Sequence, residues 1–132
     1  MPEIATTIEH LSGGSAAGLV FTPHLVPMTR GILVTIYCRG TATTAQCLSA
    51  ARDFYAARDF IRVSDTPPQT KWATGSNLSF VSYAADPKRN LVIAMGVVDN
   101  LGKGAAGQAV QNANLMCNLP ETTGLEGLPV WP

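Results

Sequence analysis

The sequence lacks an excess of charge of either sign. Nine lysine and arginine residues balance nine aspartates and glutamates over 132 residues. The arginines are scattered from Arg30 to Arg89 and form no basic stripe that would collect a phosphate backbone. We therefore expect no binding of nucleic acid.

Long apolar runs, an export signal and paired cysteines are also lacking. No apolar run approaches the ~20 residues of a membrane span, and the N-terminus lacks the basic-then-apolar order of a signal peptide. The three cysteines are odd in number and contain no C-x-x-C, which favours reduced thiols over a disulfide frame or a zinc site. We expect a cytoplasmic protein with no membrane contact, no metal, and three cysteines packed as small core side chains: Cys38, Cys47 and Cys117.

The chain does contain the alternating patterns of one α+β domain. Apolar residues make up 46% of it, enough for a single hydrophobic core. Helices are predicted over 2–11, from Thr43 or Thr44 to about Arg58, and after Leu101. Extended segments are predicted over 17–22, 32–38, 61–63, 77–84 and 91–98, the last two joined as an antiparallel hairpin by the turn at 86–90. The expected fold is α+β, with a mixed, mostly antiparallel sheet covered by two or three helices.

Three glycines, Gly102, Gly104 and Gly107, spell the dinucleotide-binding pattern G-x-G-x-x-G. In a working fingerprint a strand runs directly into the first glycine, and a second strand with an acidic residue follows the helix. Here three residues separate the strand from Gly102, and only a proline-rich tail follows. We interpret the small residues as a face for close packing, and keep a minimal dinucleotide site as an alternative that predicts NADPH binding by the chain alone.

The two histidines are candidates for a catalytic base. His10 falls near the end of a polar helix face, which favours a solvated side chain. His24 stands between Pro23 and Pro27, in a rigid segment that could line a cleft, although a packed or surface position is the more economical interpretation. Neither is near a cysteine in sequence, so no nucleophile–base pair is indicated.

Several segments together resemble one known family. They are Pro2-Glu3-Ile4, the run F-T-P-H-L-V-P-M-T-R-G from Phe21 to Gly31, Gly75-Ser76-Asn77, and V-D-N-L-G-K-G-A-A-G-Q-A-V-Q-N-A-N-L-M from Val98 to Met116, followed by L-P-E-T-T-G-L. Over essentially its whole length the chain resembles the C-terminal portion of N-acetyl-gamma-glutamyl-phosphate reductase, an enzyme of arginine biosynthesis. One departure is Gly102, where valine is more usual.

The resemblance implies an NADPH-dependent reductase that converts N-acetyl-L-glutamyl 5-phosphate to the 5-semialdehyde and phosphate. In that family a cysteine thiolate attacks the acyl phosphate, and the resulting thioester accepts hydride from the nicotinamide. The thiolate, the base in a His-Arg-His segment and most of the NADP(H) site would belong to a Rossmann portion, which we expect to be absent from this chain. We therefore expect the isolated chain to be inactive, with none of its own residues acting as nucleophile or base.

The same resemblance implies a small set of binding residues. Asn100 matches the position expected to hold the nicotinamide carboxamide, and Lys103 lies beside it in sequence. Arg30 is the candidate for an anionic group of the substrate, because a guanidinium pairs with carboxylate or phosphate in bidentate fashion. Glu3 would stand two residues beyond the family's catalytic histidine.

The resemblance also implies how the chain is organised. Residues 1–98 would form the substrate and dimerisation domain of a two-domain, semialdehyde-dehydrogenase-like reductase. Residues 99–132, the last helix and its tail, would pack on the Rossmann half, and the whole would form a homo-oligomer. Without that half, the helix would expose an apolar face of Leu101, Ala105, Ala109, Ala113 and Met116. The alternative is a free-standing α+β module that oligomerises or binds a partner without catalysis.

Overall fold

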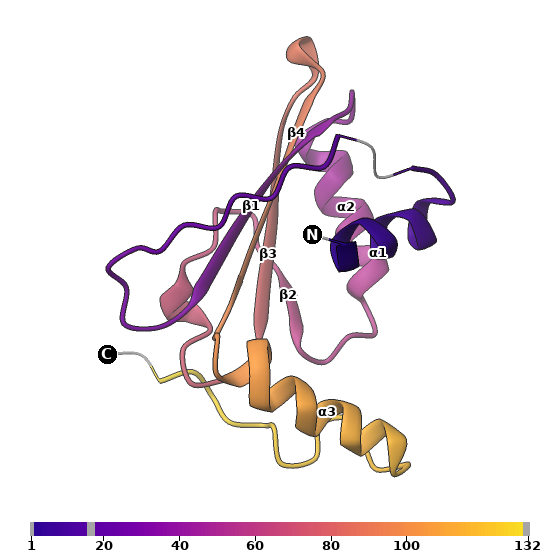
Figure 1. The fold of residues 1–132 in the computed structure, drawn as a ribbon. Coiled ribbons are helices and arrows are strands. Elements are labelled where there is room, and N and C mark those ends of the chain that lie inside the picture. Colours follow the sequence, from indigo (N-terminus) through magenta and orange to yellow (C-terminus); the bar gives the residue numbers. More distant parts are fainter. Residues whose placement is uncertain (1, 16–17, 131–132) are drawn as a thin grey trace.

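A mixed four-stranded sheet forms the centre of the computed structural model, which describes residues 2–15 and 18–130 (Figure 1). The strands are β1 (Ile32–Arg39), β2 (Ile61–Val63), β3 (Ser79–Asp86) and β4 (Leu91–Val98), in the spatial order β1-β4-β3-β2. β4 is antiparallel to both β1 and β3, and β2 is parallel to β3. The predicted hairpin of β3 and β4 is confirmed, its turn closing through Asn90 in the left-handed region at φ 52°.

The helices are α1 (Pro2–Ser12), α2 (Thr44–Tyr55) and α3 (Gly107–Met116), and α3 is preceded by a π-helical turn, η3 (Gly102–Ala106). Two short 3-10 turns, η1 (Thr70–Trp72) and η2 (Pro87–Arg89), complete the elements. This arrangement confirms the predicted α+β class with a mixed, mostly antiparallel sheet.

Three elements differ clearly from the prediction. One is β3, which spans Ser79–Asp86 where 77–84 was expected. α2 begins where expected, at a capping box in which Thr43 and Gln46 exchange hydrogen bonds, but it ends at Tyr55 and not near Arg58. The segment predicted as extended over 17–22 forms no strand in its described part, 18–22, while Ala17 lies outside the described residues. Among the residues that the structure describes, β1 pairs with β4 alone, so this segment has no strand partner.

The buried core is small, and α2 covers the part of the sheet formed by β2 and β3. Its apolar members are Leu48, Ala51, Phe60, Ala73 and Val97. On β3, the Phe80 ring packs edge to face against Trp72 of η1, with centroids 5.6 Å apart. This core anchors one half of the sheet and leaves the β1 edge uncovered.

Every side chain of β1 is exposed, although most are apolar. Ile36 is 50% exposed and Tyr37 is 70% exposed, and no strand pairs with the outer edge of β1 within the described residues. The expectation of buried cysteines is wrong: Cys38 is exposed because it lies on this edge, Cys117 lies exposed after α3, and Cys47 is half-buried. An uncovered apolar edge strand is a typical pairing surface.

α3 has the reverse of the usual burial pattern. Its buried positions are Gly107, Gln111 and Asn114, whereas Leu115 is 53% and Met116 is 84% exposed. The apolar face expected from the sequence is therefore exposed as predicted, at Leu101, Ala105, Ala109, Ala113 and Met116. A helix that buries its polar side chains and exposes its apolar ones has its hydrophobic partner elsewhere.

The glycines of the G-x-G-x-x-G pattern are packing positions. A Cβ atom on Gly102 would lie 2.5 Å from the carbonyl oxygen of Ser76, and one on Gly107 would lie 2.2 Å from Oδ1 of Asn77. The backbone of the turn and of α3 thus approaches the 75–77 loop more closely than any side chain allows. This supports the interpretation of a small-residue packing face.

Within residues 2–15 and 18–130, no helix is long and apolar enough to cross a membrane. Nor do three or more His, Cys, Asp or Glu side chains gather there as a metal site would require.

Replacing Gly107 by alanine should destabilise the fold by about 1–3 kcal/mol, because the added methyl group collides with Asn77 and with the Gly102 backbone. Urea unfolding of Gly107→Ala measures the loss. The control is Gly127→Ala, where the methyl group meets open space and the free energy of unfolding should change by less than about 0.5 kcal/mol. Equal midpoints for the two variants would contradict the packing role of Gly107.

Candidate functional site

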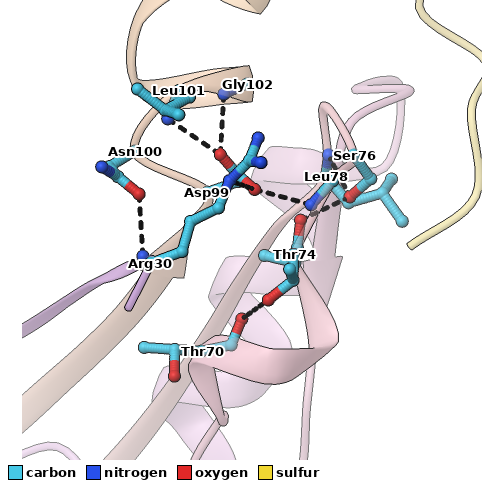
Figure 2. A network of polar contacts seen from close by, with 12 residues as sticks. Arg30, Thr70, Thr74, Ser76, Leu78, Asp99, Asn100, Leu101 and Gly102 are labelled. Carbon is cyan, nitrogen blue, oxygen red and sulfur yellow. Dashed lines mark hydrogen bonds and ion pairs between the residues drawn. The ribbon is translucent and has the colours of Figure 1, made fainter. Parts of the chain in front are cut away.

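The candidate site lies where three segments meet at one end of the sheet. Ile32 pairs with Val98, and Ser79 pairs with the same residue from the other side. The residues just before β1, just before β3 and just after β4 are therefore brought together by strand register alone. Arg30 and Gly31, the 75–78 loop, and Asp99 with Asn100 occupy these three positions (Figure 2).

Asp99 is the centre of this junction, with no exposed surface. Its Oδ1 accepts hydrogen bonds from the backbone N–H groups of Leu101 and Gly102, both at 2.8 Å. Its Oδ2 accepts from the N–H of Gly75 at 2.6 Å and forms an ion pair with Nε of Arg30 at 2.7 Å (Figure 2). One carboxylate thus joins all three segments.

These contacts change the ionisation of Asp99. Burial alone would raise its pKa, but the hydrogen bonds from Gly75, Gly102, Arg30 and Leu101 favour the charged form more strongly and lower the pKa from 3.8 to about 2. The carboxylate therefore stays ionised throughout the neutral and mildly acidic range, and its negative charge is available to hold the Arg30 guanidinium.

Asn100 forms a second connection parallel to the first. Its Oδ1 accepts a hydrogen bond of 2.8 Å from the N–H of Gly31 (Figure 2). Gly31 has φ +113°, and a Cβ there would lie 2.8 Å from Cβ of Thr70, so only glycine suits this backbone. Two consecutive residues before β1 are thus held by two consecutive residues after β4.

The hydrogen-bond donors of Arg30 and Asn100 that remain unused determine what the site can bind. Among the described residues, Asp99 is the ion-pair partner of the Arg30 guanidinium, with the contact at Nε, and the Arg30 side chain is 37% exposed. The two terminal amino groups of Arg30 can therefore receive a carboxylate or phosphate in bidentate fashion. The amide NH₂ group of Asn100 remains as a donor, since its oxygen is used by Gly31.

Lys103 belongs to a different cluster. Its Nζ donates to Oε1 of Gln111 at 2.5 Å and lies 5.5 Å from the centroid of the Phe60 ring. Gln111 also accepts from Nδ2 of Asn77 at 3.0 Å and donates to a carboxylate oxygen of Glu121. Burial lowers the pKa of Lys103, and the Glu121 charge partly offsets this.

The Lys103 cluster fastens η3, α3 and the tail to the 75–77 loop. Asn114 strengthens it by donating from Nδ2 to the carbonyl oxygens of Glu121 and Thr123. Within the described residues these contacts include none of Arg30, Asp99 and Asn100, so the structure does not bring the ammonium of Lys103 together with the amide of Asn100.

Glu3 and the two histidines lie on exposed segments. Glu3 is exposed in the first turn of α1, and its backbone oxygen accepts from Thr7 Oγ1 at 2.8 Å. His10 is exposed in the last turn of the same helix. His24 is exposed too, with Nδ1 at 3.0 Å from the backbone oxygen of Thr22.

No thiol stands at the junction within the described residues. Cys38 pairs in register with Val92, at the end of β4 remote from Asp99, while Cys47 lies in α2 and Cys117 follows α3. The site therefore offers a guanidinium and an amide for binding, and its described contacts include neither a nucleophile nor a base.

Asp99 is the residue that the sequence interpretation missed. A signal for it existed, because an aspartate at the start of a helical segment accepts from the N–H groups two and three residues ahead, as Asp99 does here. Its pairing with Arg30, 69 positions earlier in the chain, had no local signal.

Comparisons with known proteins place this geometry in context. Residues 1–100 match the family model described as semialdehyde dehydrogenase, dimerisation domain. The full chain is 83% identical to N-acetyl-gamma-glutamyl-phosphate reductases of Methylobacterium sp. (strain 4-46) and Bradyrhizobium sp. (strain ORS 278), and spans 41% of the length of each. It is 47% identical to the reductase of that name from Geobacter metallireducens, of which it spans 39%.

Among solved structures the fold is similar to aspartate semialdehyde dehydrogenase II from Vibrio cholerae, alone and complexed with ASA. The TM-scores are 0.55 and 0.54 at 27% and 26% identity, over 70% of this chain and 29% of the other. These likenesses fit a C-terminal portion of a longer enzyme.

The stability of the fold should fall in acid because of Asp99. Its folded-state pKa, about 2, lies below the ordinary value of 3.8, so its stabilising contribution is complete above about pH 5 and is lost as the pH falls toward 2. The shift corresponds to roughly 2 kcal/mol. Asp99→Asn should remove this part of the acid dependence, as measured by urea unfolding between pH 5 and pH 2.

The control for this experiment is Asp65→Asn, which alters an exposed ion pair with Arg52. Exposed pairs contribute little, so this variant should retain the acid dependence of the original chain. An Asp99→Asn variant with an unchanged pH profile would show that another group controls the acid response.

Proposed function

This chain belongs to the semialdehyde dehydrogenase dimerisation-domain family, and from that premise we propose that it is the C-terminal portion of an N-acetyl-gamma-glutamyl-phosphate reductase. The reaction is the NADPH-dependent reduction of N-acetyl-L-glutamyl 5-phosphate to the 5-semialdehyde and phosphate, in arginine biosynthesis in the cytoplasm. The observation that carries the proposal is 83% identity over the whole chain to relatives of that name. The junction around Asp99 supplies the chemistry that such a portion would contribute.

In this proposal the chain binds and orients, and a Rossmann portion supplies the nucleophilic thiolate, the base and most of the NADP(H) site. Arg30 receives an anionic group of the substrate on its terminal amino groups, which lie beside the fixed Asp99 carboxylate. When bound, NADPH supplies the hydride. Asn100 fits a nicotinamide carboxamide as a donor, because its NH₂ group is left over after Gly31 has occupied its oxygen.

The structure gives less support for ligand binding by Lys103 and Glu3 than for binding by Arg30 and Asn100. The ammonium of Lys103 is directed to Gln111 and Phe60, which favours a role in holding η3 and the tail against α3. Glu3 has an exposed side chain on α1, and it would reach the substrate only across the contact with the Rossmann portion. We therefore retain Asn100 as the cofactor contact and Arg30 as the substrate contact.

The reversed burial of α3 supports the proposed division into residues 1–98 and 99–132. A helix that exposes Leu115 and Met116 while burying Gln111 and Asn114 requires an apolar partner. In the complete enzyme that partner would be the Rossmann portion. Its contact would place η3, and with it Asn100, next to the cofactor.

Homo-oligomerisation is proposed through the β1 edge. Eight consecutive exposed residues, most of them apolar, form the free edge of the sheet. The matched family is described as a dimerisation domain, and an edge strand of this kind buries its apolar side chains by meeting a second copy.

The proposed activity can be tested by exchange. The chain replaces the corresponding 132 residues of the Methylobacterium relative, which yields a protein that we term the exchange enzyme. It should reduce N-acetyl-L-glutamyl 5-phosphate with NADPH, whereas the isolated chain should show no turnover. Activity of the isolated chain would mean that one of its own cysteines is catalytic. An inactive but folded exchange enzyme would instead favour a module that binds a partner without catalysis.

In the exchange enzyme, Asn100→Ala should raise the KM for NADPH by about tenfold, the equivalent of one hydrogen bond of about 1.4 kcal/mol. Steady-state kinetics with varied NADPH measure the change. Lys88→Ala is the control, since Lys88 is exposed in η2, next to the end of β4 that is remote from Asn100. A KM for NADPH equal in both variants would exclude Asn100 from the cofactor site.

Ile36→Lys should convert the oligomer to monomers, because it places a charge in the middle of the apolar β1 edge. Light scattering coupled to gel filtration measures the mass. Phe54→Lys serves as control: Phe54 is 72% exposed, but on α2. An unchanged mass for Ile36→Lys would place the subunit contact elsewhere.

A further inference from the structure

We propose that Asp99 is the positioning residue of the substrate site, and that it acts through Arg30 to present a fixed guanidinium fork to an anionic group. The proposal rests on the function proposed above, and deepens it by assigning a role to a side chain that itself touches no ligand. The ligand chemistry is a carboxylate or a phosphate, either of which matches the spacing of the two terminal amino groups.

The Asp99 carboxylate is held rigidly before it meets Arg30. Three backbone N–H groups, from Gly75, Leu101 and Gly102, donate to it over 2.6–2.8 Å. These donors come from two segments, the loop before β3 and the turn after β4, so rotation of the carboxylate would break bonds on both sides. A completely buried acceptor with three backbone donors is a fixed point for its fourth partner.

The fourth partner of the carboxylate is Arg30, which contacts it along the side of the guanidinium that carries Nε. Arg30 meets Asp99 through Nε at 2.7 Å, not through its terminal amino groups. Because the guanidinium is planar, fixing Nε on an immobile carboxylate limits rotation of the whole group. The side chain remains 37% exposed, so the fork is restrained yet reachable by a ligand. Reduced side-chain freedom before binding lowers the entropic cost of capturing the anion.

Because Asp99 is buried, its role differs from that of a residue that contacts the ligand. With 0% exposure it cannot touch a substrate, and any effect on binding must pass through Arg30 or the backbone. The chain offers a contrast in the pair of Arg52 and Asp65, joined at 2.5 Å but with side chains 48% and 75% exposed. An exposed pair of this kind restrains its arginine weakly.

The test is a double-mutant cycle in the exchange enzyme, using Arg30→Gln, Asp99→Asn and the double variant. Kd values for N-acetyl-L-glutamate and for inorganic phosphate are measured by calorimetry, beside KM and kcat for the acyl phosphate. In each single variant, the Kd for one of the two anions should rise by about ten- to hundredfold. The double variant should bind that anion no more weakly than Arg30→Gln alone, because Asp99 acts only through Arg30.

The anion whose Kd changes shows which group of the substrate Arg30 binds. Loss of N-acetyl-L-glutamate binding alone assigns the Arg30 fork to a substrate carboxylate, and loss of phosphate binding alone assigns it to the phosphoryl group. If neither Kd changes in Asp99→Asn, the positioning role is overturned, as it is if the losses in the double variant add. Arg52→Gln is the control and should leave both Kd values unchanged.

A merely structural role would give a different result. If Asp99→Asn only lowered the fraction of folded enzyme, kcat per total protein would fall while KM and the Kd values stayed constant. Should that variant not fold, Arg30→Lys replaces it, since lysine keeps the charge but has neither Nε–H nor a fork. Arg30→Lys should then weaken anion binding as much as Arg30→Gln, and full retention of affinity would overturn the proposal.

The two proposals fail in distinguishable ways. A folded exchange enzyme that binds anions with the expected coupling of Arg30 and Asp99, but reduces no acyl phosphate, contradicts the proposed reaction and supports the positioning role. Normal turnover together with additive losses contradicts the positioning role and supports the reaction.

Discussion

The buried carboxylate of Asp99 is the interaction on which this end of the molecule depends. It accepts hydrogen bonds from the loop before β3 and the turn after β4, and it forms an ion pair with the arginine before β1. A carboxylate removed from water is stable only when such donors replace its hydration. Since the donors lie on three separate segments, satisfying one buried charge also fixes their relative positions. Arg30, Gly31 and Asn100, the groups with which the site can bind, are consequences of that arrangement.

The two ends of the domain are stabilised by different means. Where α2 covers β2 and β3, ordinary apolar packing of Leu48, Ala51 and Phe60 forms the core. Around α3 the buried groups are polar, and Gln111 connects Lys103, Asn77 and Glu121 by hydrogen bonds. The apolar surfaces of α3 and β1 are left outside, which is the pattern of a domain whose stability is completed by neighbours. A cofactor-binding portion for α3 and a second copy for β1 would satisfy both surfaces.

The glycine pattern shows how a motif can mislead when its context is left out. Gly102, Gly104 and Gly107 have the spacing of a dinucleotide fingerprint. However, Asp99 stands between β4 and the first glycine, and its carboxylate caps the turn by accepting a hydrogen bond from the N–H of Gly102. Gly102 and Gly107 are small because Ser76 and Asn77 lie against them. The context that argued against the fingerprint, three residues between strand and glycine and no second strand after the helix, was visible in the sequence; the neighbour that requires the glycines was not.

By itself the sequence determined the features that depend on neighbours along the chain. The helix cap at Thr43, the hairpin around Asn90 and the strand after Gly31 follow from periodicity and local hydrogen bonding. Only the tertiary structure decided what joins distant segments: that β1 pairs with β4, that Cys38 therefore lies on an open edge, that Lys103 is directed to Gln111, and that Arg30 meets Asp99. The physical reason is that strand register and buried charge pairs are chosen by the whole sheet at once, and no local pattern records which distant partner satisfies a given donor or acceptor.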